Sequence, residues 1–198
     1  MGVTSLPIYW LDYPASVRPT SELATVVAFT ALVVGSDFAL APFVNIKLMD
    51  TLVFIVAFVF GLRAGAAVAV LSELVWSFVS PWGAAGPITP FLVGGELVFA
   101  LVGWWASRVW GGAARQVTRN SVYFGAVMLA CAFVWDFETN AVTALLAYWP
   151  SVTFQKLVVT EVLGIPFAIV HEGVDFLLGL LVVPAAIIAI PRLVRGRI

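Results

Sequence analysis

Acidic side chains placed within long apolar segments are the residues of this sequence most able to do chemistry. A charge at the depth of a bilayer is costly unless it faces water or a partner, so such residues are candidates for a functional site. Together with one amide and the single histidine, the candidates are Glu73, Glu96, Asp136, Glu138, Asn140, His171, Glu172 and Asp175. An excess of carboxylates favours a cation or a protonated amine as the bound substrate.

Helical spacing indicates that several of these side chains converge. On an ideal helix a face about 100° wide holds one group of four: Glu161, His171, Glu172 and Asp175. Asp136 and Asn140 lie four residues apart and share a face of the preceding segment. The spacing therefore predicts a polar cavity among the third, fourth, fifth and sixth helices, open at the outer end of the bundle.

A simpler explanation stays open for some of the acids. An isolated polar residue in a membrane helix often only hydrogen-bonds to a neighbouring helix, and Glu73 fits that role as well as a binding role. Glu138 and Glu161 could equally lie at the level of the lipid headgroups. The aligned acids around His171 are harder to explain in this way.

The composition indicates whether the protein folds in water or in a membrane. Of 198 residues, 62% are hydrophobic and 11% are charged, against roughly 25% charged residues in soluble domains. A soluble enzyme and a disordered chain are excluded, and so is a nucleic-acid binder, which needs a basic face. The sequence predicts an all-α polytopic membrane protein.

Six apolar segments are the elements that must position the acids. A helix needs about 20 residues to cross the hydrocarbon core, and the predicted segments are residues 22–41, 48–62, 64–79, 91–107, 121–148 and 157–190. The last is too long for one straight span, and Gly164, Pro166 and Gly173 are expected to break or kink it. We expect residues 1–21 to form a cytoplasmic or interfacial lead-in, 22–190 the membrane domain and 191–198 a basic cytoplasmic tail.

The basic residues predict the orientation. If the N-terminus is cytoplasmic, the inner sites hold Arg18, Arg63, Arg108, Arg115, Arg119, Arg192, Arg195 and Arg197, whereas the outer sites hold only Lys47 and Lys156. Positive charge concentrates on the cytoplasmic side of membrane proteins. The expectation is a multi-pass protein of the plasma membrane with six helices and both termini in the cytoplasm.

Short motifs add a family resemblance. The first helix carries Ala24 and Ala28 in an Ala-x-x-x-Ala pattern, with Ala31 one turn further on, and small residues at this spacing let another helix approach closely. The stretch Asn-Ile-Lys-Leu-Met-Asp at 45–50 and the stretch Gly-Leu-Arg-Ala-Gly at 61–65 follow. The chain resembles an S component, the substrate-capture subunit of an energy-coupling factor (ECF) transporter. Met49-Asp50 stands where Gly-Asp is common in that family.

The resemblance implies a function, partners and roles for particular residues. An S component captures a small vitamin or precursor outside the cell and docks through its first helix, here Ala24, Ala28 and Ala31, onto a membrane coupling (T) subunit driven by two cytoplasmic ATPases. The loops at 37–50 and 80–90 would gate the site. The chain lacks a Gly-x-x-x-x-Gly-Lys phosphate loop, so we expect it to be no enzyme, with ATP hydrolysis on the partners. We expect no cofactor.

The substrate class follows from the acids and the single histidine. Carboxylate and imidazole also suit a metal ion. However, His171 is the only nitrogen ligand side chain, and metal-type S components carry an N-terminal Met-His where this chain has Met1-Gly2. A cationic or amine-bearing vitamin or precursor is therefore expected ahead of a metal.

Two rival functions remain open at the level of sequence. One is an integral-membrane enzyme acting on a lipid or isoprenoid, in which Asp136, Glu138 and the acids around His171 would do acid–base or metal chemistry. Its acids should face the cytoplasmic half or the lipid. The other is a small proton-coupled carrier or structural membrane protein, which an inverted repeat would favour; none is evident between 22–107 and 121–190.

Overall fold

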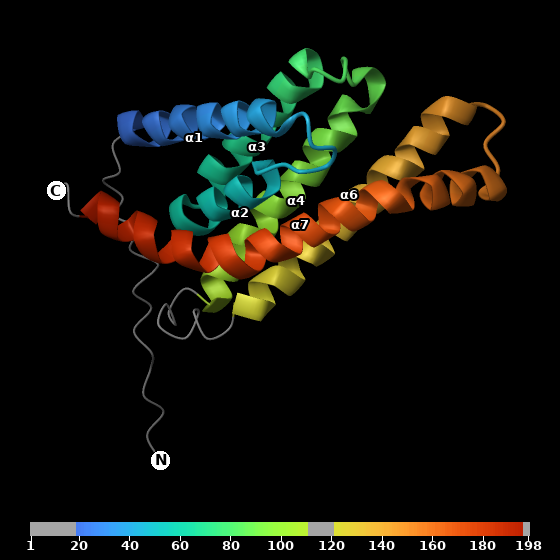
Figure 1. Cartoon of the computed structure of the whole chain (residues 1–198). Coiled ribbons are helices and arrows are strands. Elements are labelled where there is room, and N and C mark those ends of the chain that lie inside the picture. The colour runs from blue at the N-terminus through green and yellow to red at the C-terminus, as the bar shows by residue number, and fades with distance from the viewer. Residues whose placement is uncertain (1–18, 111–120, 196–198) are drawn as a thin grey trace.

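The computed structural model describes residues 19–110 and 121–195, and every regular element in these ranges is helical. The elements are α1 (Pro19–Leu40), α2 (Met49–Phe60), α3 (Leu62–Val79), the 3-10 turn η1 (Gly86–Ile88), α4 (Thr89–Trp110), α6 (Ser121–Tyr148) and α7 (Phe154–Arg195) (Figure 1). The predicted all-α class is confirmed. The interfacial lead-in falls almost wholly outside the described residues, as do Arg115, Arg119 and the end of the basic tail.

Five of the helices are long and apolar enough to cross a membrane, and α2 is a shorter apolar helix. At 12 residues, α2 rises only about 18 Å, short of the ~30 Å hydrocarbon core. The description as a polytopic helical bundle therefore holds, with one of the six predicted segments shorter than a full span.

The short helix α2 forms the centre of the bundle. Its residues from Val53 to Ala57 are at most 1% exposed, and it contacts α1, α3, α4 and α7. A helix that is apolar all round is stable where protein surrounds it on every side. The α2–α3 junction turns at Gly61, whose φ of 92° favours glycine. A Cβ on Gly65 would overlap Ala57, so the two helices meet at close range.

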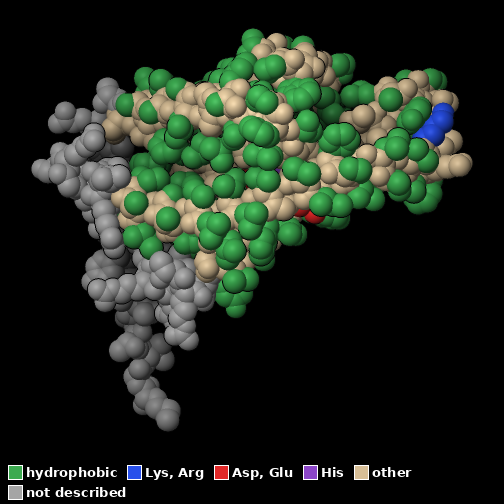
Figure 2. Space-filling view, viewed as in Figure 1, with side chains coloured by type: hydrophobic (Ala, Val, Ile, Leu, Met, Phe, Trp, Pro, Cys, Tyr) green, Lys and Arg blue, Asp and Glu red, His purple; other side chains and the backbone are tan. Residues whose placement is uncertain are grey.

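The outer surface of the bundle is apolar. Large side chains such as Leu23 (64% exposed), Phe78 (66%) and Leu163 (67%) project from different helices, and hydrophobic atoms cover most of the described face in Figure 2. Exposed apolar surface of this extent indicates a lipid environment rather than water. The long apolar helices and their apolar outer surface thus support a membrane protein.

The last helix is bent but unbroken. Of the break or kink expected at Gly164, Pro166 or Gly173, the break does not occur, because α7 stays helical over 42 residues with Pro166 and Pro184 inside it. Figure 1 shows α7 as one long bent ribbon packed along α6. Proline removes one backbone hydrogen bond but need not stop a helix that a neighbour supports.

Candidate functional site

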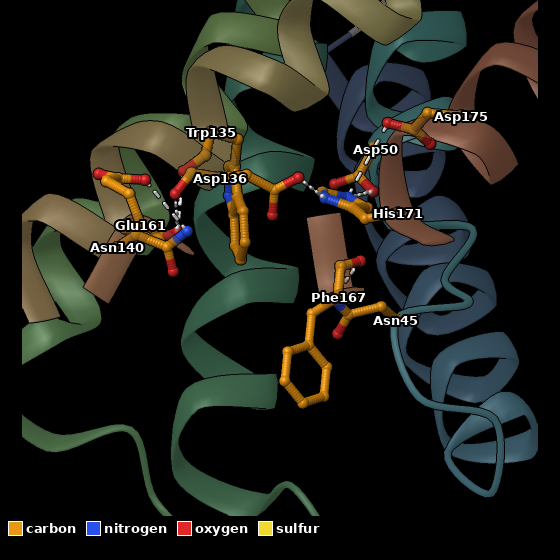
Figure 3. Close-up of polar contacts among 10 residues, drawn as sticks. Asn45, Asp50, Trp135, Asp136, Asn140, Glu161, Phe167, His171 and Asp175 are labelled. Atoms are coloured by element: carbon orange, nitrogen blue, oxygen red, sulfur yellow. Dashed lines mark hydrogen bonds and ion pairs between the residues drawn. The ribbon is translucent and has the colours of Figure 1, made fainter. Parts of the chain in front are cut away.

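A buried histidine joins three helices at the centre of the candidate site. His171 lies on α7, and its Nδ1 is 3.1 Å from Oδ2 of Asp136 on α6. Its Nε2 is 3.0 Å from Oδ2 of Asp50, at the start of α2 (Figure 3). Asp175, one turn further along α7, places its Oδ2 4.0 Å from the same Nε2. We call these four residues the His171 cluster.

The His171 cluster is sealed from solvent. Asp50 and Asp175 are 0% exposed, His171 is 2% exposed and Asp136 is 7% exposed. Within the described part of the chain, neither carboxylate oxygen of Asp175 has a hydrogen-bond partner. A buried carboxylate without a partner is costly, so these oxygens require a proton or a cation.

Two further buried glutamates lie on α3 and α4. Oε1 of Glu73 accepts a hydrogen bond of 2.8 Å from the Ser77 hydroxyl, one turn along α3. Glu96 is 0% exposed, and its carboxyl lies within hydrogen-bonding reach of the Asp50 carboxyl, so the two acids can share a proton. The bundle therefore holds more buried acid than the single imidazole of His171 can neutralise.

Lys47 supplies the second positive charge. It lies in the segment before α2, and its Nζ is 4.8 Å from the centroid of the Trp135 ring. Burial alone would lower the pKa of the Lys47 ammonium, but the negative charges of Asp50, Glu73 and other nearby carboxylates outweigh it and raise the pKa above 10.5. Trp135 in turn meets the His171 ring edge-on at 5.2 Å. Lys47 and Trp135 thus connect the loop to the His171 cluster.

A cavity of about 240 Å³ lies on the loop side of Lys47. Its walls come from the 41–47 and 80–85 segments, from the ends of α1 and α3, and from Leu92 on α4. Its polar and aromatic lining includes Asp37, Phe43, Lys47, Trp76, Ser77 and Trp82. The sequence predicts a cavity among the third to sixth helices. The observed cavity lies nearer α1 and α3, between the two loops expected to gate the site.

Asp37 is the acid that faces this cavity. It is 1% exposed, and its Oδ1 accepts a 3.0 Å hydrogen bond from the Leu48 backbone N–H. Its Oδ2 is without a partner in the described structure. The loop above it is fastened to α7, because the Asn45 side chain donates a 3.1 Å hydrogen bond to the Phe167 carbonyl (Figure 3). A buried carboxylate oxygen without a partner therefore lies beside the cavity, and a guest would reach it only after the Asp37 side chain or its neighbours move.

The remaining site residues predicted from the sequence lie outside both the His171 cluster and the cavity. The Asn140 amide donates a 3.4 Å hydrogen bond to Oε2 of Glu161 (Figure 3), at a point where Gly164 lets α6 and α7 meet closely. Glu138 and Glu172 are half-buried. The structure thus brings Asp136, His171 and Asp175 together and leaves Glu138, Asn140, Glu161 and Glu172 outside the cluster.

Three residues of the site escaped the sequence reasoning. Asp37 and Asp50 marked only the ends of a gating loop, and Lys47 was counted as an outer basic residue. A lysine and an aspartate three residues apart at the entry to a wholly apolar helix are a signal, because neither is otherwise expected beside such a segment.

Comparison of the chain with protein-family models, with curated proteins and with solved structures gave no match. The resemblance to S components therefore rests on the sequence motifs alone.

Proposed function

We propose that the chain is the substrate-capture subunit of an ECF-type importer, which takes a small cationic or amine-bearing molecule from outside the cell. The observation that carries the proposal is the cavity between the 41–47 and 80–85 segments, which has one acid, Asp37, among its lining residues. The cavity lies at the opposite end of the helices from Arg63 and Arg108. By the charge rule that end faces outward, with both termini in the cytoplasm.

The lining suits a small aromatic amine. A protonated amine can pair with Oδ2 of Asp37, while Phe43, Trp76 and Trp82 offer ring faces to an apolar or cationic ring. The volume of about 240 Å³ is slightly below the roughly 300 Å³ at which drug-sized pockets begin. A ligand about the size of one substituted ring system fits these dimensions.

The proposal also assigns a docking face to α1. Ala24, Ala28 and Ala31 are exposed, and a Cβ built on Gly35 would meet no described atom within 4 Å. This face of small residues would contact the coupling subunit, which two cytoplasmic ATPases drive. Replacing Ala24 and Ala28 by Leu should abolish co-purification with that subunit, whereas the size-matched change of both to Ser should preserve it. Co-purification that survives both pairs of changes would remove α1 from the interface.

Untargeted mass spectrometry of small molecules retained by the purified full chain tests the capture role. We expect an amine-bearing compound in the wild type and at least tenfold less of it in Asp37→Asn, because the variant keeps an oxygen for the Leu48 N–H but loses the charge. Glu172→Gln, which changes an acid outside the cavity, should retain the compound. Recovery of a lipid product in its place would favour the enzyme alternative.

The alternative of a membrane enzyme acting on a lipid or isoprenoid has less support. Its acids should be reachable from the lipid or the cytoplasmic half. The members of the His171 cluster are at most 7% exposed, and the accessible cavity lies at the loop end of the bundle.

A further inference from the structure

The His171 cluster has the donor atoms of a metal centre. Single ligand atoms from Asp50, His171 and Asp175 all lie within 4.8 Å of one another, and all three residues are buried. His171 Nε2 is 3.0 Å from one aspartate oxygen and 4.0 Å from the other. These two separations bracket the about 3.4 Å expected between neighbouring ligands of a tetrahedral Zn²⁺ with bonds near 2.1 Å.

The fourth member of the cluster completes the pattern. Without an ion, both ring nitrogens lie within hydrogen-bonding distance of an aspartate, Nδ1 at 3.1 Å from Asp136 and Nε2 at 3.0 Å from Asp50, so a protonated imidazole can donate to both. Histidines that bind metals usually donate a hydrogen bond through the other ring nitrogen, which fixes the tautomer and orients the ring. An ion that displaces the Nε2 proton would therefore find Nε2 directed toward Asp50 and Asp175, with Nδ1–H held by Asp136.

The unpartnered oxygens are a separate observation that points to a cation. Asp175 is 0% exposed, and neither of its oxygens is hydrogen-bonded within the described ranges. In Figure 3 the Asp175 carboxylate lies across from the His171 ring. A proton would satisfy one oxygen, whereas a divalent ion between the three residues would satisfy both carboxylates at once.

We propose that Asp50, His171 and Asp175 bind one divalent transition-metal ion, with Zn²⁺ as the reference ion and Asp136 as the residue that positions the imidazole. An imidazole ligand favours Zn²⁺ and its neighbours over Mg²⁺ or Ca²⁺, which prefer oxygen ligands. The sequence analysis favoured an amine over a metal because His171 is the one nitrogen ligand. The fold changes this balance, because it brings the Asp50 carboxylate from α2 next to His171 and Asp175. The ion would link α2 to α7 inside the bundle. The metal site is separate from the loop cavity, so it is a further site beside the proposed capture site.

Elemental analysis of the full chain, purified without chelator, tests this site. After loading with Zn²⁺ and removal of unbound ion, the wild type should hold about one Zn²⁺ per chain. Asp175→Asn should bind Zn²⁺ at least tenfold more weakly, and it is expected to fold because the carboxylate accepts no hydrogen bond from described residues. Glu172→Gln, a neighbouring acid outside the cluster, should bind like the wild type. Asp136→Asn should weaken binding roughly 10–100-fold, as loss of an orienting partner does.

A second measurement guards against a folding defect. Co²⁺ loaded in place of Zn²⁺ should give visible absorption bands in the wild type and in Glu172→Gln but not in Asp175→Asn. Zn²⁺ should raise the unfolding temperature of the wild type and leave that of Asp175→Asn unchanged. Wild-type protein that holds no metal after loading overturns the proposal. Equal metal in the wild type, Asp175→Asn and His171→Gln overturns it as well, because it indicates adventitious metal only.

Discussion

The two polar regions of the molecule are built differently. The His171 cluster is formed by residues from three helices, and each of these residues is at most 7% exposed. The cavity is lined mainly by loop segments, and Trp82 in its lining is 63% exposed. The difference indicates a division of roles. The buried His171 cluster links helices, whereas the accessible cavity can bind a small molecule.

Lys47 lies where the two regions meet. It lines the cavity, and its ammonium lies against Trp135, which contacts His171. Its positive charge offsets part of the buried acid from the loop side. A cationic guest at Asp37 would therefore share the carboxylates with Lys47, so ligand binding and the position of this side chain should be linked.

The largest effect should come from the sealed region. His171→Ala removes the partner of both Asp50 and Asp136 and should lower the free energy of unfolding by about 3–5 kcal/mol, the usual result of breaking a buried charged pair. Glu172→Ala, at the next position, should change it by less than about 0.5 kcal/mol. Denaturant unfolding in detergent micelles measures both. Equal losses would show that the cluster has no special structural role.

A steric change separates helix packing from the lipid-facing surface. Gly65→Val places atoms where Ala57 already lies, so it should destabilise the bundle by about 1–3 kcal/mol. Gly35→Val on the open face of α1 meets no described atom and should leave the thermal unfolding temperature nearly unchanged. A stable Gly65→Val variant would contradict the close α2–α3 contact.

A smaller effect is expected at Lys47, with a defined dependence on pH. Because the folded state raises its pKa above 10.5, its contribution to stability is complete below that pH and is lost as the pH rises through the folded value. Lys47→Met should therefore cost about 1–2 kcal/mol at pH 7 and at pH 9 alike, as loss of a charged partner does. The gap between wild type and variant should narrow only as the pH rises above 10.5. A gap that already closes at pH 9 would show that the carboxylates do not stabilise the ammonium.

Much of the fold follows from the sequence because apolar length and turn residues act locally. The predicted segment at 121–148 coincides with α6, and the segments predicted at 48–62 and 64–79 correspond to α2 and α3, which meet at Gly61. The shared face of His171 and Asp175 was also predictable from helical spacing. Each of these depends on residues close together in the chain.

The partners of the site could not be predicted in the same way. Asp50 and His171 are 121 residues apart, and periodicity within one helix does not show which helix covers a given face. The continuity of α7 through Pro166 depends on packing against α6, and the position of Lys47 depends on how the loop folds back over Trp135. All three are set by tertiary contacts.

The most direct test of separate roles compares Asp37→Asn with Asp175→Asn in one experiment. Both purified full-length variants are analysed for retained small molecules by mass spectrometry and for bound Zn²⁺ by elemental analysis. The division of roles predicts that Asp37→Asn loses the small molecule and keeps the metal, while Asp175→Asn loses the metal and keeps the small molecule. Loss of both from either variant, or the absence of both from the wild type, would contradict it.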